Sequence, residues 1–143
     1  NEVNSLISFG NSLVYANVVS GIRATALDPA VSYLHEPGER RYSLSLDIAD
    51  LFKPVLADRV LFRLVNREQI TSEHFRSELG SCLLTEEGRK IYTKEFEKTL
   101  ERTVEHPDLN RKVSYQYLLR LEAYKLKKHL LTGEGYDAFQ RWW

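Results

Sequence analysis

We predict an all-α fold from this sequence: a single compact helical domain of about five to seven helices. Apolar side chains recur at spacings of three and four along most of the chain, which is the period of an α-helix. One stretch alternates instead, at residues 42–48, but no second strand is evident to pair with it. With 143 residues and 43% hydrophobic composition, the chain can form one domain with its own core.

The first helix is expected to run from the start of the chain to about Asp28. Pro29 ends it, because a proline disfavours helical geometry in the residue before it. Pro29 itself is expected to open a short second helical turn. The core-facing stripe of the first helix consists of Leu6, Phe9, Leu13, Val14, Val18 and Ile22.

A second long helix is expected from about Asp47 to Asn66, after an extended segment that leads into it. Pro54 would lie in its opening turns, where a missing amide proton is tolerated best. The apolar stripe of this helix is Leu51, Val55, Val60 and Leu64. Residues 70–75 show a further helix start, because two hydroxyl side chains that favour N-caps precede an acid there.

Thr85 predicts the start of the next helix, because it is a capping residue followed by two acids that complement the helix dipole. This helix is expected to reach about His106, ahead of Pro107. A last long helix should cover roughly residues 113–131, with Gly133 as its C-cap. The residues expected to face inward on it are Tyr117, Leu118, Leu121 and Tyr124.

The composition limits the classes of function. Lysine and arginine balance aspartate and glutamate at a formal net charge of zero, so the total charge gives no argument for nucleic-acid binding. From Arg111 onward, seven basic residues stand against three acids, which makes the final segment locally basic. No apolar stretch is long enough for a membrane span, and no secretory segment opens the chain. We therefore expect a soluble, cytoplasmic protein that does not enter a membrane.

Two smaller features have a structural interpretation. Cys82 is the one cysteine, which excludes an internal disulfide and suits a reducing compartment. We expect it to be a thiol in the core, because cysteine is among the residue types most often buried. The aromatic residues Phe139, Trp142 and Trp143 either pack back onto the domain or form an interface, and we expect them to pack back.

The residues with the clearest chemistry are His35, Asp47 and Asp50, which lie on either side of a proline–glycine turn. Imidazole and carboxylate groups are ligands for divalent cations such as Mg²⁺, Mn²⁺ or Zn²⁺. Because Asp47 and Asp50 are three apart, a helix would place both on one face. The residues alone leave other interpretations open: His35 as a loop histidine bonded to backbone, and the aspartates as acids in the first turn of a helix.

The same region resembles a known family. The segments at residues 28–35 and 43–54 resemble the catalytic stretch of the CRISPR-associated integrase family, the DNA endonuclease and recombinase of spacer acquisition. Residues 1–15, 84–97 and 136–143 resemble further stretches of that family. The resemblance covers nearly the whole chain and is most specific from His35 to Lys53.

The resemblance implies a divalent ion, Mg²⁺ or Mn²⁺, held by His35, Asp50 and a glutamate that lies upstream of Asn1 in the family pattern. Asp47 would be a nearby catalytic group, and the roles of the two aspartates could be exchanged. Glu2 belongs to a different place in the pattern and is not a substitute for the glutamate. We therefore expect residues 1–143 to be the C-terminal helical, metal-dependent catalytic domain of a longer protein.

Lys53 and Lys90 are the candidate DNA contacts. Lys53 lies one helical turn beyond Asp50, where its ammonium group could reach a phosphate held by the metal. Lys90 follows a helix start in a stretch that resembles the family. For both lysines the alternative is a side chain surrounded by water. The same two interpretations apply to the basic residues of the last helix, Arg120, Lys125, Lys127 and Lys128.

The resemblance also implies partners: double-stranded or branched DNA, a second copy of the protein in a homodimer, and a small partner subunit of CRISPR adaptation. The alternative is a non-catalytic helical module for dimerisation or DNA docking, with His35 and the aspartates in structural roles.

Overall fold

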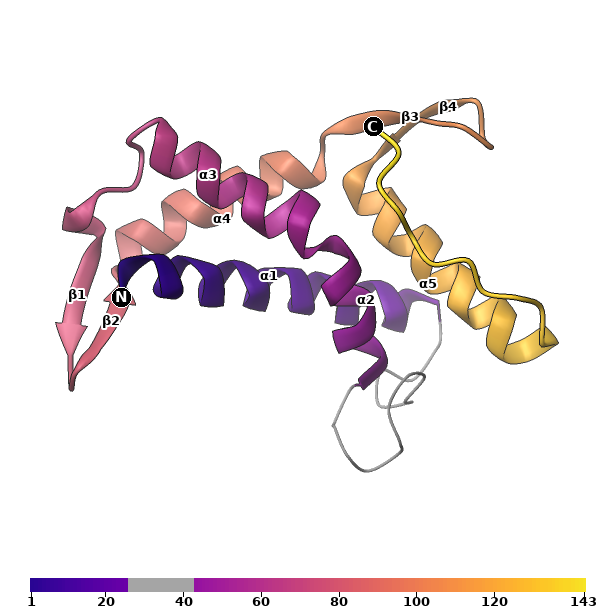
Figure 1. Cartoon of the computed structure of the whole chain (residues 1–143), viewed down its shortest axis with the longest axis horizontal. Helices are drawn as coiled ribbons and strands as arrows, with labels where there is room; N and C mark the ends of the chain where they lie inside the picture. The colour runs from indigo at the N-terminus through magenta and orange to yellow at the C-terminus, as the bar shows by residue number, and fades with distance from the viewer. Residues whose placement is uncertain (26–42) are drawn as a thin grey trace.

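The computed structural model describes residues 1–25 and 43–143, except for the side chains of residues 43 and 44. The described part of the chain contains long helices joined by two short β-hairpins (Figure 1). In chain order the elements are α1 (Glu2–Ala24), α2 (Ser43–Lys53), η1 (Pro54–Asp58), α3 (Arg59–Asn66), η2 (Ser72–His74), β1 (Phe75–Glu78), β2 (Ser81–Leu84), α4 (Glu86–Leu100), β3 (Thr103–His106), β4 (Arg111–Ser114) and α5 (Tyr115–Thr132).

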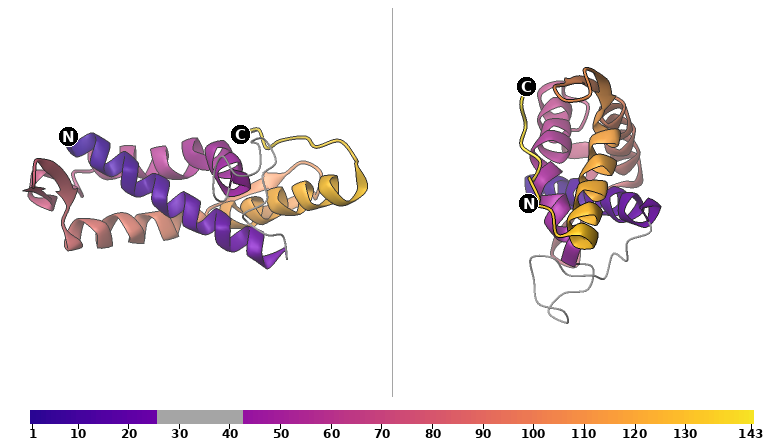
Figure 2. Two further views of the ribbon diagram at one scale, coloured as in Figure 1. Left: turned by 90° about the horizontal axis from the view of Figure 1, so that it is seen from below. Right: turned by 90° about the vertical axis from the view of Figure 1, so that its right-hand side faces the viewer.

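Helix α1 is the central element of the fold. The Asn1 side chain caps it by accepting a hydrogen bond of 2.8 Å from the backbone N–H of Asn4. Helices α2, α3, α4 and α5 all contact it. Figure 2 shows an elongated molecule, with the β1–β2 hairpin at one end and α5 with the C-terminal segment at the other. The buried apolar stripe of α1 confirms the one expected from the sequence at Leu6, Val14, Val18 and Ile22.

The second helical run confirms the expected end at Asn66 but begins earlier than predicted. Helix α2 starts at Ser43, so the expected extended lead-in to Asp47 is wrong for residues 43–46. Pro54 lies well inside the run rather than in its opening turns. The five-residue π-helical segment η1 begins at Pro54. Proline has no backbone N–H, and the change to π-helical geometry lets the helix continue past the missing hydrogen bond.

The predicted all-α class is wrong, because two antiparallel hairpins interrupt the helices. In the first, Phe75 pairs with Leu84 and Glu78 with Ser81. Its two-residue turn uses positive φ at Leu79 and Gly80, the conformation of a tight hairpin turn. The fold is therefore mixed, mainly helical with two small sheets. Strands of four residues are too short for their alternation to be distinguished from helical spacing in the sequence.

The second hairpin corrects the predicted end of the helix that Thr85 caps. The cap itself is confirmed, since the Thr85 hydroxyl accepts from the N–H of Gly88 at 3.1 Å. The helix ends at Leu100 rather than near His106, and the following residues form β3. The helix start expected in residues 70–75 is present, with Thr71 as the N-cap, but it leads only to the short 3₁₀ helix η2 before β1.

Helix α5 agrees closely with the sequence. It begins after the cap residue Ser114 and ends at Thr132. Gly133 is the C-cap, and its φ of 73° is the left-handed conformation expected of a glycine there. Leu118 faces the core as predicted, whereas Tyr124 is 52% exposed and does not. Cys82 is half-buried in β2 rather than a core residue.

Tyr92 of α4 lies at the centre of the core. Its ring packs edge-on against Phe9 at 5.3 Å between centroids, and its hydroxyl donates to the carbonyl of Ala57 at 3.2 Å. Burial raises the pKa of Tyr92 well above its ordinary value, and the negative charge of Asp58 adds to the rise. The tyrosine therefore joins α1, η1 and α4 as a neutral group.

The C-terminal segment, residues 133–143, packs back on the domain, as expected from its aromatic residues. Phe139 stacks on Phe52 of α2, and Trp143 stacks on Tyr115 of α5. Among the described helices, none has the length and apolar character needed to cross a membrane.

Candidate functional site

Helix α2 carries both candidate aspartates on its outer face. The residues buried on the opposite side are Ser45, Ile48, Ala49 and Phe52. That burial fixes the rotation of the helix, because these side chains share one face at the α-helical period. Asp47 is half-buried and Asp50 is exposed, and their spacing places them one turn apart. The helix thus carries the two aspartates on one face, as the sequence predicted, and that face is the one opposite the core.

Lys53 is the closest described cation to Asp50. Its Nζ atom lies 2.8 Å from a carboxylate oxygen of Asp50, and the two side chains are 32% and 67% exposed. An ion pair of this kind at the surface contributes about 1 kcal/mol or less. Lys53 can therefore exchange Asp50 for another anion at small cost in free energy.

Lys90 is held apart from the aspartates. It lies in the second turn of α4, next to Glu86 at 3.5 Å, and its side chain is 77% exposed. Figures 1 and 2 place this end of α4 beside the β1–β2 hairpin, whereas α2 lies nearer the other end of the molecule. The structure does not bring Lys90 together with Asp47 and Asp50.

His35 lies outside the described residues. That its imidazole lies close to the carboxylates of Asp47 and Asp50 stays a prediction. Within residues 1–25 and 43–143, no three histidine, cysteine, aspartate or glutamate side chains gather closely enough to hold a metal ion. The described part of the candidate metal centre consists of Asp47 and Asp50 on α2.

Sequence reasoning missed a buried acid that binds the C-terminal segment. Glu122 of α5 is buried and accepts hydrogen bonds from the Tyr136 hydroxyl and, at 3.2 Å, from the backbone N–H of Phe139. Its other oxygen lies 2.9 Å from Nζ of Lys125. A signal was present in the sequence, because Glu122 lies four residues from both Leu118 and Leu126 and so falls on the apolar stripe of its helix.

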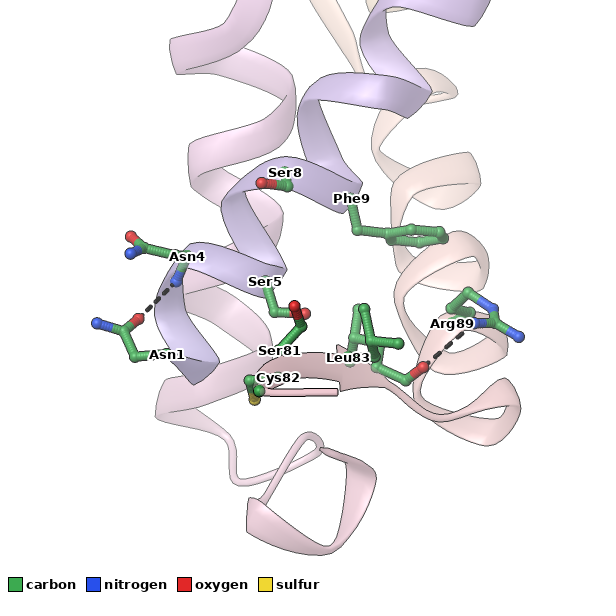
Figure 3. Close-up of a pocket in the computed structure, with 11 residues that line it drawn as sticks. Asn1, Asn4, Ser5, Ser8, Phe9, Ser81, Cys82, Leu83 and Arg89 are labelled. Atoms are coloured by element: carbon green, nitrogen blue, oxygen red, sulfur yellow. Dashed lines mark hydrogen bonds between the residues drawn. The ribbon is translucent and has the colours of Figure 1, made fainter. Parts of the chain in front are cut away.

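A separate hollow of about 630 Å³ opens between the first turns of α1 and the β1–β2 hairpin (Figure 3). Asn4 and Ser8 line one side of it, and Cys82 and Leu83 line the other. Arg89 borders it and donates a hydrogen bond of 3.2 Å to the carbonyl of Leu84. None of the candidate site residues lines this hollow.

The architecture is that of a mainly helical domain that presents paired carboxylates on the outer face of one helix. Residues 1–98 match the family model described as "CRISPR associated protein Cas1". The chain belongs to the Cas1 family. This confirms the resemblance drawn from residues 28–35 and 43–54.

A curated relative supports the assignment over the entire chain. The chain is 62% identical over all its 143 residues to a protein of Haloferax volcanii named "CRISPR-associated endonuclease Cas1". The match covers 100% of this chain and 43% of the relative. The chain thus spans less than half the length of that relative.

Solved structures show the same fold. A CAS1 protein from Thermotoga maritima is 50% identical, with a TM-score of 0.83 over 90% of this chain and 40% of that one. A casposase bound to integration product is 25% identical, with a TM-score of 0.82 over 92% of this chain and 38% of that one.

Proposed function

We propose that this chain is the catalytic helical domain of a divalent-metal-dependent DNA endonuclease and integrase of CRISPR adaptation. The reaction is a phosphodiester transesterification that inserts spacer DNA into the repeat array. The observation that carries the proposal is the 62% identity, over the whole chain, to a relative named as a Cas1 endonuclease. The casposase, whose structure holds an integration product, shares the fold at 25% identity and supports the same chemistry.

The aspartates of α2 fit the proposed cofactor. Carboxylate oxygens are the preferred donors of Mg²⁺ and Mn²⁺, and Asp50 offers its group to solvent at the surface of α2. His35 and Asp50 would hold the ion, with Asp47 beside them, together with the glutamate that the family pattern supplies from upstream. A bound ion would polarise the scissile phosphate and offset the negative charge that builds on its oxygens.

The basic residues of the chain then have distinct tasks. Lys53 is close enough to Asp50 to offer its ammonium group to a DNA phosphate at the site, since their surface ion pair is weak. Lys90 would contact the DNA backbone elsewhere, along α4. The attacking group is a 3′ hydroxyl of the incoming DNA, or water when the strand is only nicked, so no protein side chain becomes covalently bound.

The proposed partners are double-stranded or branched DNA, a second copy of the protein, and a small adaptation subunit. One observation favours the alternative of a non-catalytic module for dimerisation or DNA docking. Helix α3 exposes Phe62 and Val65, and apolar side chains next to each other on a surface are typical of contact sites.

Strand-transfer assays with the full-length protein and a repeat-bearing DNA separate the two functions. We expect joined product with Mn²⁺, none with a chelator, and none from Asp50→Asn with Mn²⁺ present. The matched control is Asp108→Asn, which removes an exposed carboxylate from the β3–β4 turn and should keep wild-type activity. A full yield of product from Asp50→Asn would support the docking module instead.

A further inference from the structure

The C-terminal segment has an anchor inside the protein. Glu122 has a side chain that is only 2% exposed, and its carboxylate receives two hydrogen bonds from this segment. Buried carboxylates are stable in a fold only when donors and cations surround them, and Lys125 supplies the cation. Residues 136–139 have no regular secondary structure. The hydrogen bonds to Glu122 therefore favour one position of this segment on the domain.

The anchored segment touches the helix that carries the aspartates. The rings of Phe139 and Phe52 stack with centroids 4.3 Å apart and planes 13° apart. Phe52 is fully buried and lies two residues beyond Asp50 on α2. The stacked ring thus closes over the core-facing side of α2, directly behind the outer face that presents Asp47 and Asp50.

Two further contacts hold the segment beyond Phe139. The indole N–H of Trp142 donates to the carbonyl of Glu105 in β3 at 2.9 Å. The Trp143 ring stacks on Tyr115 at the start of α5, with 5.3 Å between centroids. The segment is therefore fixed on both sides of the Phe139 contact, and Figure 1 shows it following α5 towards β3.

From these contacts we infer that residues 133–143 form a positioning strap for α2. Glu122 anchors the strap, and Phe139 transmits its position to Phe52 and so to the two aspartates. Phe52, Phe139 and Glu122 are positioning residues, since they act through α2 and not on substrate. The inference rests on the proposed function only where it concerns the rate of the reaction.

The catalytic consequence follows from the spacing along α2. A rotation or tilt of the helix moves the carboxylates of Asp47 and Asp50, and a displacement of about 1 Å at a reacting centre can lower a rate by about a hundredfold. Loss of the strap should therefore reduce the rate of the chemical step. DNA binding should persist, because the exposed lysines remain in place.

The first test is hydrogen–deuterium exchange on the full-length protein carrying Phe139→Ala. We expect the amides of α2 to exchange at least about tenfold faster than in wild type, because local opening becomes easier once the stacked ring is removed. The β1–β2 hairpin at the far end of the molecule should not change. Tyr124→Ala is the matched control, since it removes an exposed ring from α5 and should leave α2 unchanged.

The second test is kinetic. Phe139→Ala should lower kcat for strand transfer by about ten- to a hundredfold and change KM for DNA by less than about twofold. Phe139→Tyr keeps the planar ring and should restore both kcat and slow exchange of α2. Unchanged exchange of α2 in Phe139→Ala, or faster exchange with wild-type kcat, would overturn the inference. A wild-type protein without strand transfer would refute the proposed function, while the exchange measurement would still decide whether the strap holds α2.

Discussion

The ammonium group of Lys127 donates a hydrogen bond of 2.8 Å to the carbonyl of Thr25. Thr25 is the C-cap residue of α1 and is buried, and its carbonyl lies at the negative end of the helix dipole. Lys127 lies 102 positions further along the chain, on α5. The bond joins the central helix to the last one at the final described residue before the segment that contains His35.

Replacing Lys127 with methionine should lower the free energy of unfolding by about 1–2 kcal/mol, because the buried carbonyl loses its charged donor. Methionine keeps most of the apolar stem, so the change isolates the hydrogen bond. Urea denaturation measures the effect. Lys128→Met, at an exposed position, should change stability by less than about 0.5 kcal/mol. Equal losses in the two variants would show that the bond to Thr25 contributes nothing.

Arg63 and Glu95 should be strongly coupled. Their side chains lie 2.7 Å apart between α3 and α4, and they are only 13% and 11% exposed. Removing either partner leaves the other charge poorly solvated, so Arg63→Met or Glu95→Leu alone should cost about 2–4 kcal/mol. The double variant should lose clearly less than the sum. Additive losses in a double-mutant cycle would contradict the pairing.

Gly10 and Gly21 should respond to alanine with opposite signs, although both lie in α1. A Cβ atom at Gly10 would overlap the Tyr92 hydroxyl and would lie 3.2 Å from Cβ of Ala57. Gly10→Ala should therefore destabilise the protein by about 1–3 kcal/mol. At Gly21 a Cβ would meet no described atom within 4 Å, so Gly21→Ala should stabilise the helix by about 0.5–1 kcal/mol. Thermal unfolding of the two variants measures the contrast.

The buried Tyr92 predicts a loss of stability at alkaline pH. In the unfolded chain the hydroxyl has a pKa of 10.0, and burial raises this pKa in the folded protein. Above pH 10 the unfolded state therefore binds fewer protons than the native state, and the free energy of unfolding falls as pH rises. Tyr92→Phe should be less stable at pH 8 by about 1 kcal/mol and should decline less steeply above pH 10. Tyr124→Phe, at an exposed position, should keep the wild-type dependence of the free energy of unfolding on pH. If Tyr92→Phe also keeps the wild-type dependence above pH 10, ionisation of Tyr92 is not the cause of the alkaline loss of stability.

Local signals in the sequence predicted those helix ends that are set by residues close together in the chain. Thr85 and Gly133 mark helix ends by their own side-chain or backbone chemistry, and α4 begins after Thr85 while α5 ends before Gly133. The first helix ends at Ala24, four residues before the end expected near Asp28. The second hairpin was missed because Val104 continues the four-residue spacing of Tyr92, Phe96 and Leu100. In the structure Val104 pairs with Val113 across β3 and β4 instead.

Local patterns likewise predicted some features of the candidate site and not others. The three-residue spacing of Asp47 and Asp50 is a local pattern, and it predicts that both carboxylates lie on one face of a helix. The imidazole near two carboxylates marked His35 as a possible metal ligand, and the family resemblance favoured that role over a loop histidine. Lys53 was chosen because it lies one helical turn beyond Asp50. The contact between Phe52 and Phe139 joins residues far apart in the sequence, and no local pattern specifies such a pair. Only the fold shows that the C-terminal segment packs against α2.

The central claim is that one divalent ion binds at His35 and Asp50, and calorimetric titration of the full-length protein with Mn²⁺ tests it most directly. We predict a measurable heat of binding in wild type, and its loss in both His35→Ala and Asp50→Ala, while Asp108→Asn binds as wild type does. Heats of binding that are unchanged in the His35 and Asp50 variants would contradict the claim.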